Sequence, residues 1–313
     1  MSIHQTKPHL LVIGGTGFIG YHLISAAKKK GWKVTRVSIR KPQRFRYIKK
    51  VEYLNINICN FKKLKKKLNK PFSHVVNLGG YIDHGPYEND KAEEINKNHF
   101  IGVINLTKIF LHKNIKKFVQ ISSSVEYGQI NSPQTENFSD IPDSYYSLSK
   151  LASTQFLLML YKNYKFPTTI LRLFQVYGPG QDRNRFLPQV IKGCIENRKF
   201  PVSKGEQVRD FCHVDDVVRA IFLALTSSKS NGEIFNIGHP EEITINDLAK
   251  LIIKVNESDS VIKNISYEEV YGKTFDDPKR RTPDISKIEK AINYKPSMNI
   301  EEMIREISTY MKS

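Results

Sequence analysis

The segment Val12-Ile13-Gly14-Gly15-Thr16-Gly17-Phe18-Ile19-Gly20 carries the most information about the architecture of this chain. The apolar run 9–13 predicts a short buried strand, and apolar residues at helical spacing predict a helix over 18–30. Glycines between a strand and a helix permit a tight turn and let a pyrophosphate approach the backbone where the helix begins. We therefore predict a dinucleotide site formed by Gly14, Gly17, Phe18, Ile19 and Gly20.

Strand and helix patterns alternate along the chain, which is typical of a parallel sheet with helices on both faces. Strands are expected at 9–13, 33–39, 51–56, 74–78, 116–122, 167–174 and 233–237. Helices are expected at 18–30, 60–69, 91–113, 146–163, 186–196, 214–225, 245–255 and in the tail 284–313, with a loop at 200–209. The expected helix caps are Asp215 or Asp216 for 214–225 and Thr244 or Asn246 for 245–255.

These patterns predict an α/β fold, a Rossmann-type doubly wound parallel sheet with a smaller α/β substrate-binding lobe at the C-terminal side. We expect residues 1–180 to form the dinucleotide-binding domain, with 210–240 returning to it. Residues 181–209 and 241–313 are then expected to form the smaller lobe.

The composition of the 313 residues limits the compartment and the partners. Hydrophobic residues make up 40% of the chain, and the three cysteines show neither a metal-binding nor a disulfide pattern. No apolar run is long enough for a signal peptide or a membrane span, so we expect a cytoplasmic protein without a metal site. The formal net charge is +18, but the lysines of 62–67 lack interleaved aromatic residues. This pattern favours a solvated helix face over a specific nucleic-acid surface.

A second signature lies downstream. The segment Ile121-Ser122-Ser123-Ser124-Val125-Glu126-Tyr127-Gly128 closes a predicted strand, and Tyr146-Ser147-Leu148-Ser149-Lys150 opens a predicted helix. Together with the glycine turn, these segments resemble the extended short-chain dehydrogenase/reductase family. The resemblance is strongest to the NAD(P)-dependent epimerase/dehydratase enzymes that modify nucleotide sugars, and it covers nearly the whole chain.

Tyr146 and Lys150 are four residues apart, so their side chains share one face of a helix. A free tyrosine has a pKa of about 10, and an ammonium about 4 Å away contributes on the order of 4 kcal/mol toward its ionisation. We therefore expect Lys150 to acidify Tyr146. The resemblance implies that Tyr146 exchanges a proton with the sugar, that Lys150 also binds the nicotinamide ribose, and that Ser123 orients the reacting oxygen.

The cofactor prediction rests on the end of the second strand, where this fold usually places a carboxylate on the adenosine ribose. No Asp or Glu precedes Glu52, and the matching position is Ser38, followed closely by Arg40 and Lys41. Basic groups suit a 2′-phosphate, so we predict a preference for NADP(H), with NAD as the alternative. Asn57 is a candidate contact to adenine.

The substrate side is also predicted by resemblance. The segments 171–180 and 209–216 are similar to family segments that position a nucleotide diphosphate sugar. The resemblance implies that arginines bind the diphosphate and that other side chains line the sugar site. The residues concerned are Arg209, Arg281, Gln175, Asp83, His84 and, in a supporting position, Ser124. The chain departs from the family at Leu78-Gly79-Gly80 and at His99, where Asn is usual; the neighbouring Asn98 is a possible substitute.

Family members carry out 4-epimerisation, 4,6-dehydration, decarboxylation or ketoreduction. Ser124 and Val125 stand where 4,6-dehydratases carry an Asp-Glu pair, so dehydration is not expected. The basic site at 38–41 favours a reductase acting at C4 of a nucleotide-linked 4-keto-6-deoxyhexose. The alternative is a nucleotide-sugar 4-epimerase that uses the same residues, and a remote alternative is a non-catalytic nucleotide- or RNA-binding protein. The resemblance also implies a homodimer.

Overall fold

The computed structural model describes residues 7–80, 91–202, 205–265 and 278–313. Its centre is a seven-stranded sheet in the order β11-β6-β5-β4-β1-β2-β3, and every neighbouring pair is parallel. The strands are β1 (His9–Ile13), β2 (Lys33–Ser38), β3 (Glu52–Asn55), β4 (His74–Asn77), β5 (Lys117–Ser123), β6 (Thr168–Leu173) and β11 (Ile234–Ile237). The predicted Rossmann-type sheet is confirmed.

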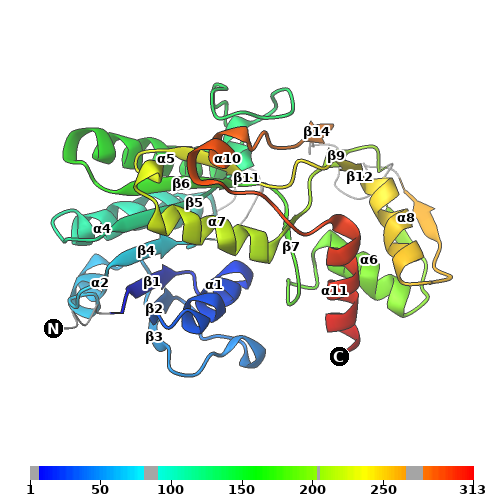
Figure 1. Cartoon of the computed structure of the whole chain (residues 1–313), viewed down its shortest axis with the longest axis horizontal. Helices are drawn as coiled ribbons and strands as arrows, with labels where there is room; N and C mark the ends of the chain where they lie inside the picture. The colour runs from blue at the N-terminus through cyan, green and yellow to red at the C-terminus, as the bar shows by residue number, and fades with distance from the viewer. Residues whose placement is uncertain (1–6, 81–90, 203–204, 266–277) are drawn as a thin grey trace.

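Helices cover both faces of the sheet (Figure 1). One apolar cluster joins the sheet to α1 (Phe18–Lys29), α7 (Val214–Thr226) and α10 (Ser286–Ile292). A second cluster joins the opposite face to α2 (Phe61–Lys67), α4 (Gly102–Phe110) and α5 (Tyr145–Tyr164). Leu10 and Val12 of β1 point into the first cluster and Leu11 and Ile13 into the second, as alternation along a strand requires.

A third apolar cluster lies beside the C-terminal ends of the strands. It is formed mainly by α6 (Phe186–Ile195), α8 (Ile245–Val255) and α11 (Ile300–Lys312), which stand together at one side of Figure 1. Small sheets accompany these helices: β12-β9-β14 and β13-β8, while β10 pairs with β7. Their strands are β7 (Val176–Tyr177), β8 (Phe200–Val202), β9 (Val208–Arg209), β10 (Cys212–His213), β12 (Ile243–Thr244), β13 (Ile262–Asn264) and β14 (Arg280–Arg281).

The segment 200–209, expected to be a loop, therefore contains β8 and β9. Strands of two or three residues depend on their partners, because so few residues carry no periodic signal. The helix expected over 91–113 is not continuous either. It consists of α3 (Lys91–Asn96), a π-helical turn η2 (Lys97–Ile101) and α4.

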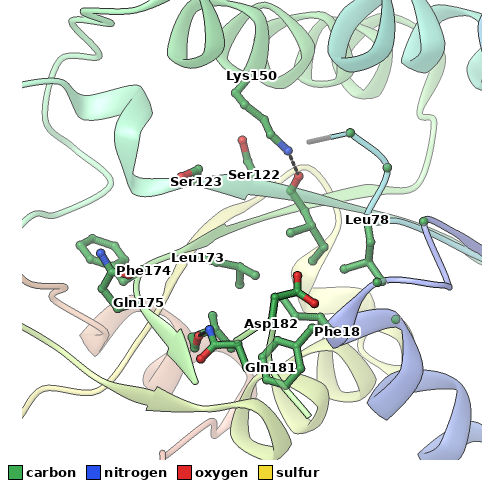
Figure 2. A pocket seen from close by; sticks show the side chains of 18 of the residues that line it. Phe18, Leu78, Ser122, Ser123, Lys150, Leu173, Phe174, Gln175, Gln181 and Asp182 are labelled. Carbon is green, nitrogen blue, oxygen red and sulfur yellow. Dashed lines mark hydrogen bonds between the residues drawn. The ribbon is translucent and has the colours of Figure 1, made fainter. Parts of the chain in front are cut away.

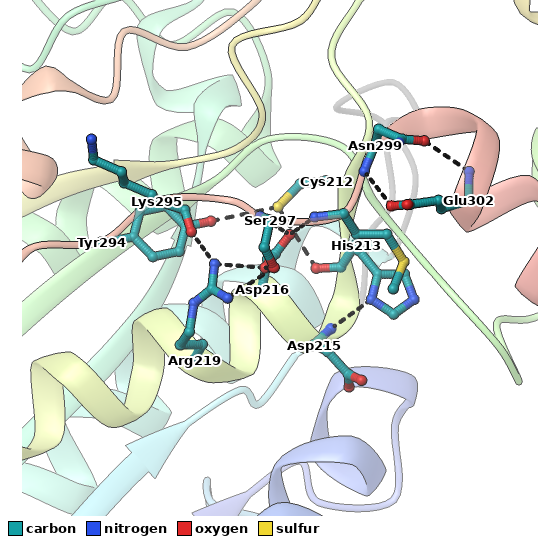
Figure 3. Close-up of polar contacts among 11 residues, drawn as sticks. Cys212, His213, Asp215, Asp216, Arg219, Tyr294, Lys295, Ser297, Asn299 and Glu302 are labelled. Carbon is teal, nitrogen blue, oxygen red and sulfur yellow. Dashed lines mark hydrogen bonds and ion pairs between the residues drawn. The ribbon is translucent and has the colours of Figure 1, made fainter.

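The tail also differs from its prediction, because α10 and α11 are separated by residues 293–299 (Figure 3). Asp216 holds this connection: its carboxylate accepts hydrogen bonds from Ser297 N, Ser297 Oγ and Met298 N. The N-cap of α7 is His213, whose Nδ1 accepts from Asp215 N, so the prediction that an aspartate caps this helix was wrong. Thr244 caps α8, as one of the two expectations had it.

Candidate active site

The turn between β1 and α1 requires glycine at defined positions. Gly14 has φ +76°, and a Cβ there would lie 2.7 Å from the carbonyl oxygen of Leu78. A Cβ on Gly20 would lie 2.6 Å from the Cα of Gly15. Gly17 is the N-cap of α1, and its N–H donates to Gly14 O. The turn therefore leaves the first helical N–H groups accessible to an anion, as a dinucleotide pyrophosphate requires.

Two cavities meet at this turn. The first, of about 490 Å³, lies over the ends of β5 and β6, and the second, of about 570 Å³, lies over the ends of β2 and β3. Gly14, Gly17 and 78–80 line both. One continuous site thus runs across the carboxyl ends of the strands, which is where open α/β sheets bind ligands. Its shape and its glycine cradle fit a dinucleotide.

The structure brings Ser123, Tyr146 and Lys150 together in the first cavity. Ser123 is the last residue of β5. Tyr146 and Lys150 stand in the first two turns of α5, which begins at the capping box of Ser144. Lys150 Nζ donates to the carbonyl oxygen of Ile121 at 3.0 Å (Figure 2). The same Nζ lies 5.8 Å from the centroid of the Tyr146 ring.

The electrostatics of this pair differ from the sequence-based expectation. Burial raises the pKa of Tyr146 well above its usual range, and the charge of Glu126 adds to this, while a hydrogen bond with Ser123 and the charge of Arg185 oppose it. Burial lowers the pKa of Lys150 to about 8. The effect of burial on Tyr146 therefore outweighs the acidification expected from Lys150, whose ammonium donates to the Ile121 carbonyl.

The cavity also contains His99, noted above only as a departure from the family, and Arg185, which was not predicted there. The ring of His99 lies edge-on to Tyr146, with centroids 5.1 Å apart, and the π-helical turn η2 places it there. Such turns are common at functional sites. Arg185, the residue before α6, also lines the cavity, together with Gln181 and Asp182. The family pattern marked the position of His99 but not its contact with Tyr146, and no local pattern indicates Arg185, because both placements depend on contacts distant in sequence.

The second cavity contains two of the residues predicted to bind the adenosine part of the cofactor. Ser38 and Arg40 line the second cavity, and Ser38 Oγ accepts from Thr16 N at 3.3 Å. Lys41 and Asn57 lie outside the cavity lining. The side chain of Asn57 instead accepts from Cys59 N at 2.8 Å, which makes it a turn residue. Glu94 and Asn98 also line this cavity and were not predicted there.

The predicted substrate residues are more dispersed. Gln175 lines the first cavity, whereas Ser124 is buried in the 3-10 turn η3 (Ser124–Tyr127) outside its lining. Arg209 and Arg281 are register partners on β9 and β14, so they stand side by side, outside both cavities. Asp83 and His84 lie outside the described residues.

Neither a metal-binding cluster nor a membrane-spanning helix occurs in the part of the chain that the structure describes. Within 7–80, 91–202, 205–265 and 278–313, no group of three or more His, Cys, Asp or Glu side chains is placed to hold a metal ion. No helix in these ranges has both the length and the apolar character needed to cross a bilayer.

Comparisons with known proteins agree with this geometry. Residues 10–238 match the sequence model of the NAD dependent epimerase/dehydratase family. A UDP-N-acetyl-alpha-D-glucosaminuronate decarboxylase of Bacillus cytotoxicus is 29% identical over 315 residues, covering 96% of each chain. The UDP-glucuronic acid 4-epimerase of Bacillus cereus, solved with UDP-glucuronic acid and NAD, is similar with a TM-score of 0.86 and 26% identity, over 97% of this chain and 99% of that one. A UDP-N-acetylglucosamine 4-epimerase of Methanobrevibacter ruminantium is similar with a TM-score of 0.88 and 26% identity, over 98% and 99% of the two chains.

Proposed function

The chain belongs to the NAD-dependent epimerase/dehydratase family, and on that premise we propose that it transfers hydride between a nicotinamide cofactor and C4 of a hexose linked to a nucleoside diphosphate. The observation that carries this proposal is the convergence of Ser123, Tyr146 and Lys150 on the cavity that begins at the glycine turn. The bound nicotinamide supplies the hydride donor or acceptor.

The three side chains then have separate tasks. Tyr146 gives its hydroxyl proton to the C4 oxygen when a ketone is reduced and takes a proton from the C4 hydroxyl when an alcohol is oxidised. Ser123, which bonds to Tyr146, donates to the same oxygen and holds it in place. Lys150 is the buried cation next to them, and its Nζ retains donors for a cofactor ribose hydroxyl besides the one given to Ile121 O.

For the direction of the reaction, we propose reduction of a 4-keto-6-deoxyhexose with NADPH. Support comes from the adenosine cavity, where the second strand ends at Ser38 without a carboxylate and Arg40 is available to a 2′-phosphate. Titration of the protein with NADP and NAD, repeated with Arg40→Ser, tests this point. Tighter binding of NADP that is lost in the variant supports the preference, and equal or tighter binding of NAD refutes it.

The second candidate is 4-epimerisation through a transient 4-keto intermediate. It is favoured by the similarity to two 4-epimerases, one of them solved with NAD. The same Ser123, Tyr146 and Lys150 would serve. Dehydration is disfavoured because Ser124 and Val125 offer no carboxylate at the positions where 4,6-dehydratases carry an acid and a base.

The remaining assignments are also proposals. We assign diphosphate binding to Arg209 and Arg281, whose positions on neighbouring strands suit one doubly charged group. The sugar is assigned to the cavity at Gln175, and the lobe built on the third apolar cluster is assigned to the nucleotide. A cytoplasmic homodimer is proposed from the family resemblance. Exposed Leu148 and Met159 on α5 are consistent with a covered helix face, which a molar-mass measurement in solution would test.

The decisive experiment incubates the protein with a panel of nucleotide hexoses and their 4-keto-6-deoxy derivatives. Absorbance of NADPH and the identity of the product are followed together. Stoichiometric NADPH loss with a 4-keto substrate supports the reductase, and interconversion of C4 epimers without net cofactor loss supports the epimerase. Salt-dependent RNA binding without turnover of any sugar would overturn both and revive the non-catalytic alternative.

A further inference from the structure

A buried ionic cluster lies against α5, the helix that carries Tyr146 and Lys150. Arg172 of β6 binds two carboxylates: its Nη2 lies 2.8 Å from Glu126 Oε2 and 2.8 Å from Asp140 Oδ2, and its Nε donates to Glu126 at 2.9 Å. Glu126 and Arg172 are both 0% exposed. Charges this deeply buried destabilise the folded protein unless opposite charges compensate them. The balance of positive and negative groups in this cluster therefore affects the protonation of its neighbours.

The cluster is fixed to the helix that carries Tyr146 and Lys150. Thr154 lies one turn beyond Lys150 and two turns beyond Tyr146, on the same face of α5. Its Oγ1 lies 3.1 Å from each carboxylate oxygen of Glu126. Glu126 is therefore anchored between β6 and the catalytic face of α5, and not only to Arg172.

Arg172 contacts two carboxylates, so one negative charge remains when both are ionised. Burial raises the pKa of Glu126 to about 7, and the charges of Arg172 and Lys150 oppose that rise. Lys150, buried at 5% exposure, is bonded to the neutral carbonyl of Ile121. Among the residues that the structure describes, the titratable groups that face the cluster or the catalytic pair are Tyr146 and Lys150 from α5, Arg172 from β6, Tyr127 from η3, Asp140 from the loop before α5, His99 from η2 and Arg185 beside α6.

We propose that Glu126 is a positioning residue that supplies the counter-charge for the Lys150 ammonium and so sets the pH range in which Tyr146 and Lys150 can transfer a proton. The proposal rests on the proposed function only for its catalytic consequence. The direction follows from Coulomb's law, because a buried negative charge favours protonation of every group near it. Glu126 accordingly raises the pKa of Lys150 against burial and raises the pKa of Tyr146.

The test compares Glu126→Gln with Asp140→Asn. Each variant removes one of the two carboxylate charges that contact Arg172 and keeps the shape of the replaced side chain. Of the two carboxylates, only that of Glu126 raises the pKa of Lys150. The titration of Lys150 is followed by NMR of protein labelled with 13C at lysine Cε, and the resonance is assigned by its loss in Lys150→Met. The pH dependence of turnover is measured on the same proteins, and circular dichroism checks their fold.

We expect Glu126→Gln to move the Lys150 titration down by about one pH unit or more, and Asp140→Asn to leave it within a few tenths. Both limbs of the turnover profile should move to lower pH in Glu126→Gln, and Glu126→Asp should restore part of the shift. Equal titration of Lys150 in the wild type and Glu126→Gln would refute the proposal. Because this readout needs no turnover, an inactive wild type would refute the proposed function and leave the test of Glu126 intact.

Discussion

Replacement of Gly14 by alanine tests whether the turn must be glycine for steric reasons. At φ +76° an alanine costs about 1–2 kcal/mol of backbone strain. Its Cβ would also lie 2.7 Å from Leu78 O, a backbone atom of the segment that follows β4. That segment is held in place because Leu78 N donates a hydrogen bond to Ile13 O. Overpacking therefore adds about 1–3 kcal/mol to the loss of stability.

The sum of about 2–5 kcal/mol corresponds to a fall in melting temperature of roughly 4–10 °C for a chain of this size. Because the shifted backbone lines both cavities, we expect cofactor affinity to fall at least about tenfold. The matched control is Gly31→Ala, which has the same φ of +76° but no atom within 4 Å of its Cβ.

Gly31→Ala should therefore show only the strain, a fall of roughly 2–4 °C, with unchanged cofactor binding. Differential scanning calorimetry and fluorescence titration with NADP measure the two quantities. If Gly14→Ala and Gly31→Ala lose equal stability and bind cofactor equally well, the steric reasoning about the turn is wrong.

Two further predictions concern buried charges. The guanidinium nitrogens of Arg36, which stacks on the ring of Tyr53, have no hydrogen-bond partner among the described residues, so Arg36→Met should leave the melting temperature unchanged or raise it. The doubly paired Arg172 is the control, and Arg172→Met should cost about 3–5 kcal/mol; a large loss in Arg36→Met would reveal an unrecognised partner. Burial lowers the pKa of His74 to about 4, so stability present above pH 6.5 should be lost as the pH falls toward 4, by roughly 3 kcal/mol. Melting temperatures from pH 7 to pH 4 should fall more steeply in the wild type than in His74→Gln, and parallel curves would contradict the assignment.

The parts of this protein that could be predicted from sequence are those whose signal is local. The glycine turn, β1 and α1 are consecutive, so one stretch of sequence shows the strand, the turn and the helix face together. Tyr146 and Lys150 were placed correctly because helical spacing alone puts them on one face. Periodicity also predicted the order of the seven central strands and of the helices α1, α2, α5, α6, α7 and α8, whose ends lie within two residues of the expected ones.

The parts that could not be predicted depend on contacts between distant segments. His99 reaches Tyr146 because a π-helical turn interrupts an apparently continuous helix, and its carbonyl accepts a hydrogen bond from Ser153 of α5. The tail is broken where Asp216, about eighty residues earlier, holds Ser297. The proposed role of Glu126 depends on its contact with Arg172, which lies 46 residues later in the sequence. No local sequence pattern connects these two residues.

The central claim is that Tyr146 exchanges the proton while hydride moves at C4. It is tested most directly by comparing Tyr146→Phe with the wild type in turnover of the substrate found in the panel, with cofactor binding measured on the same samples. We predict a loss of turnover of about 10²–10⁴-fold with unchanged cofactor affinity. Full turnover in Tyr146→Phe would contradict the account.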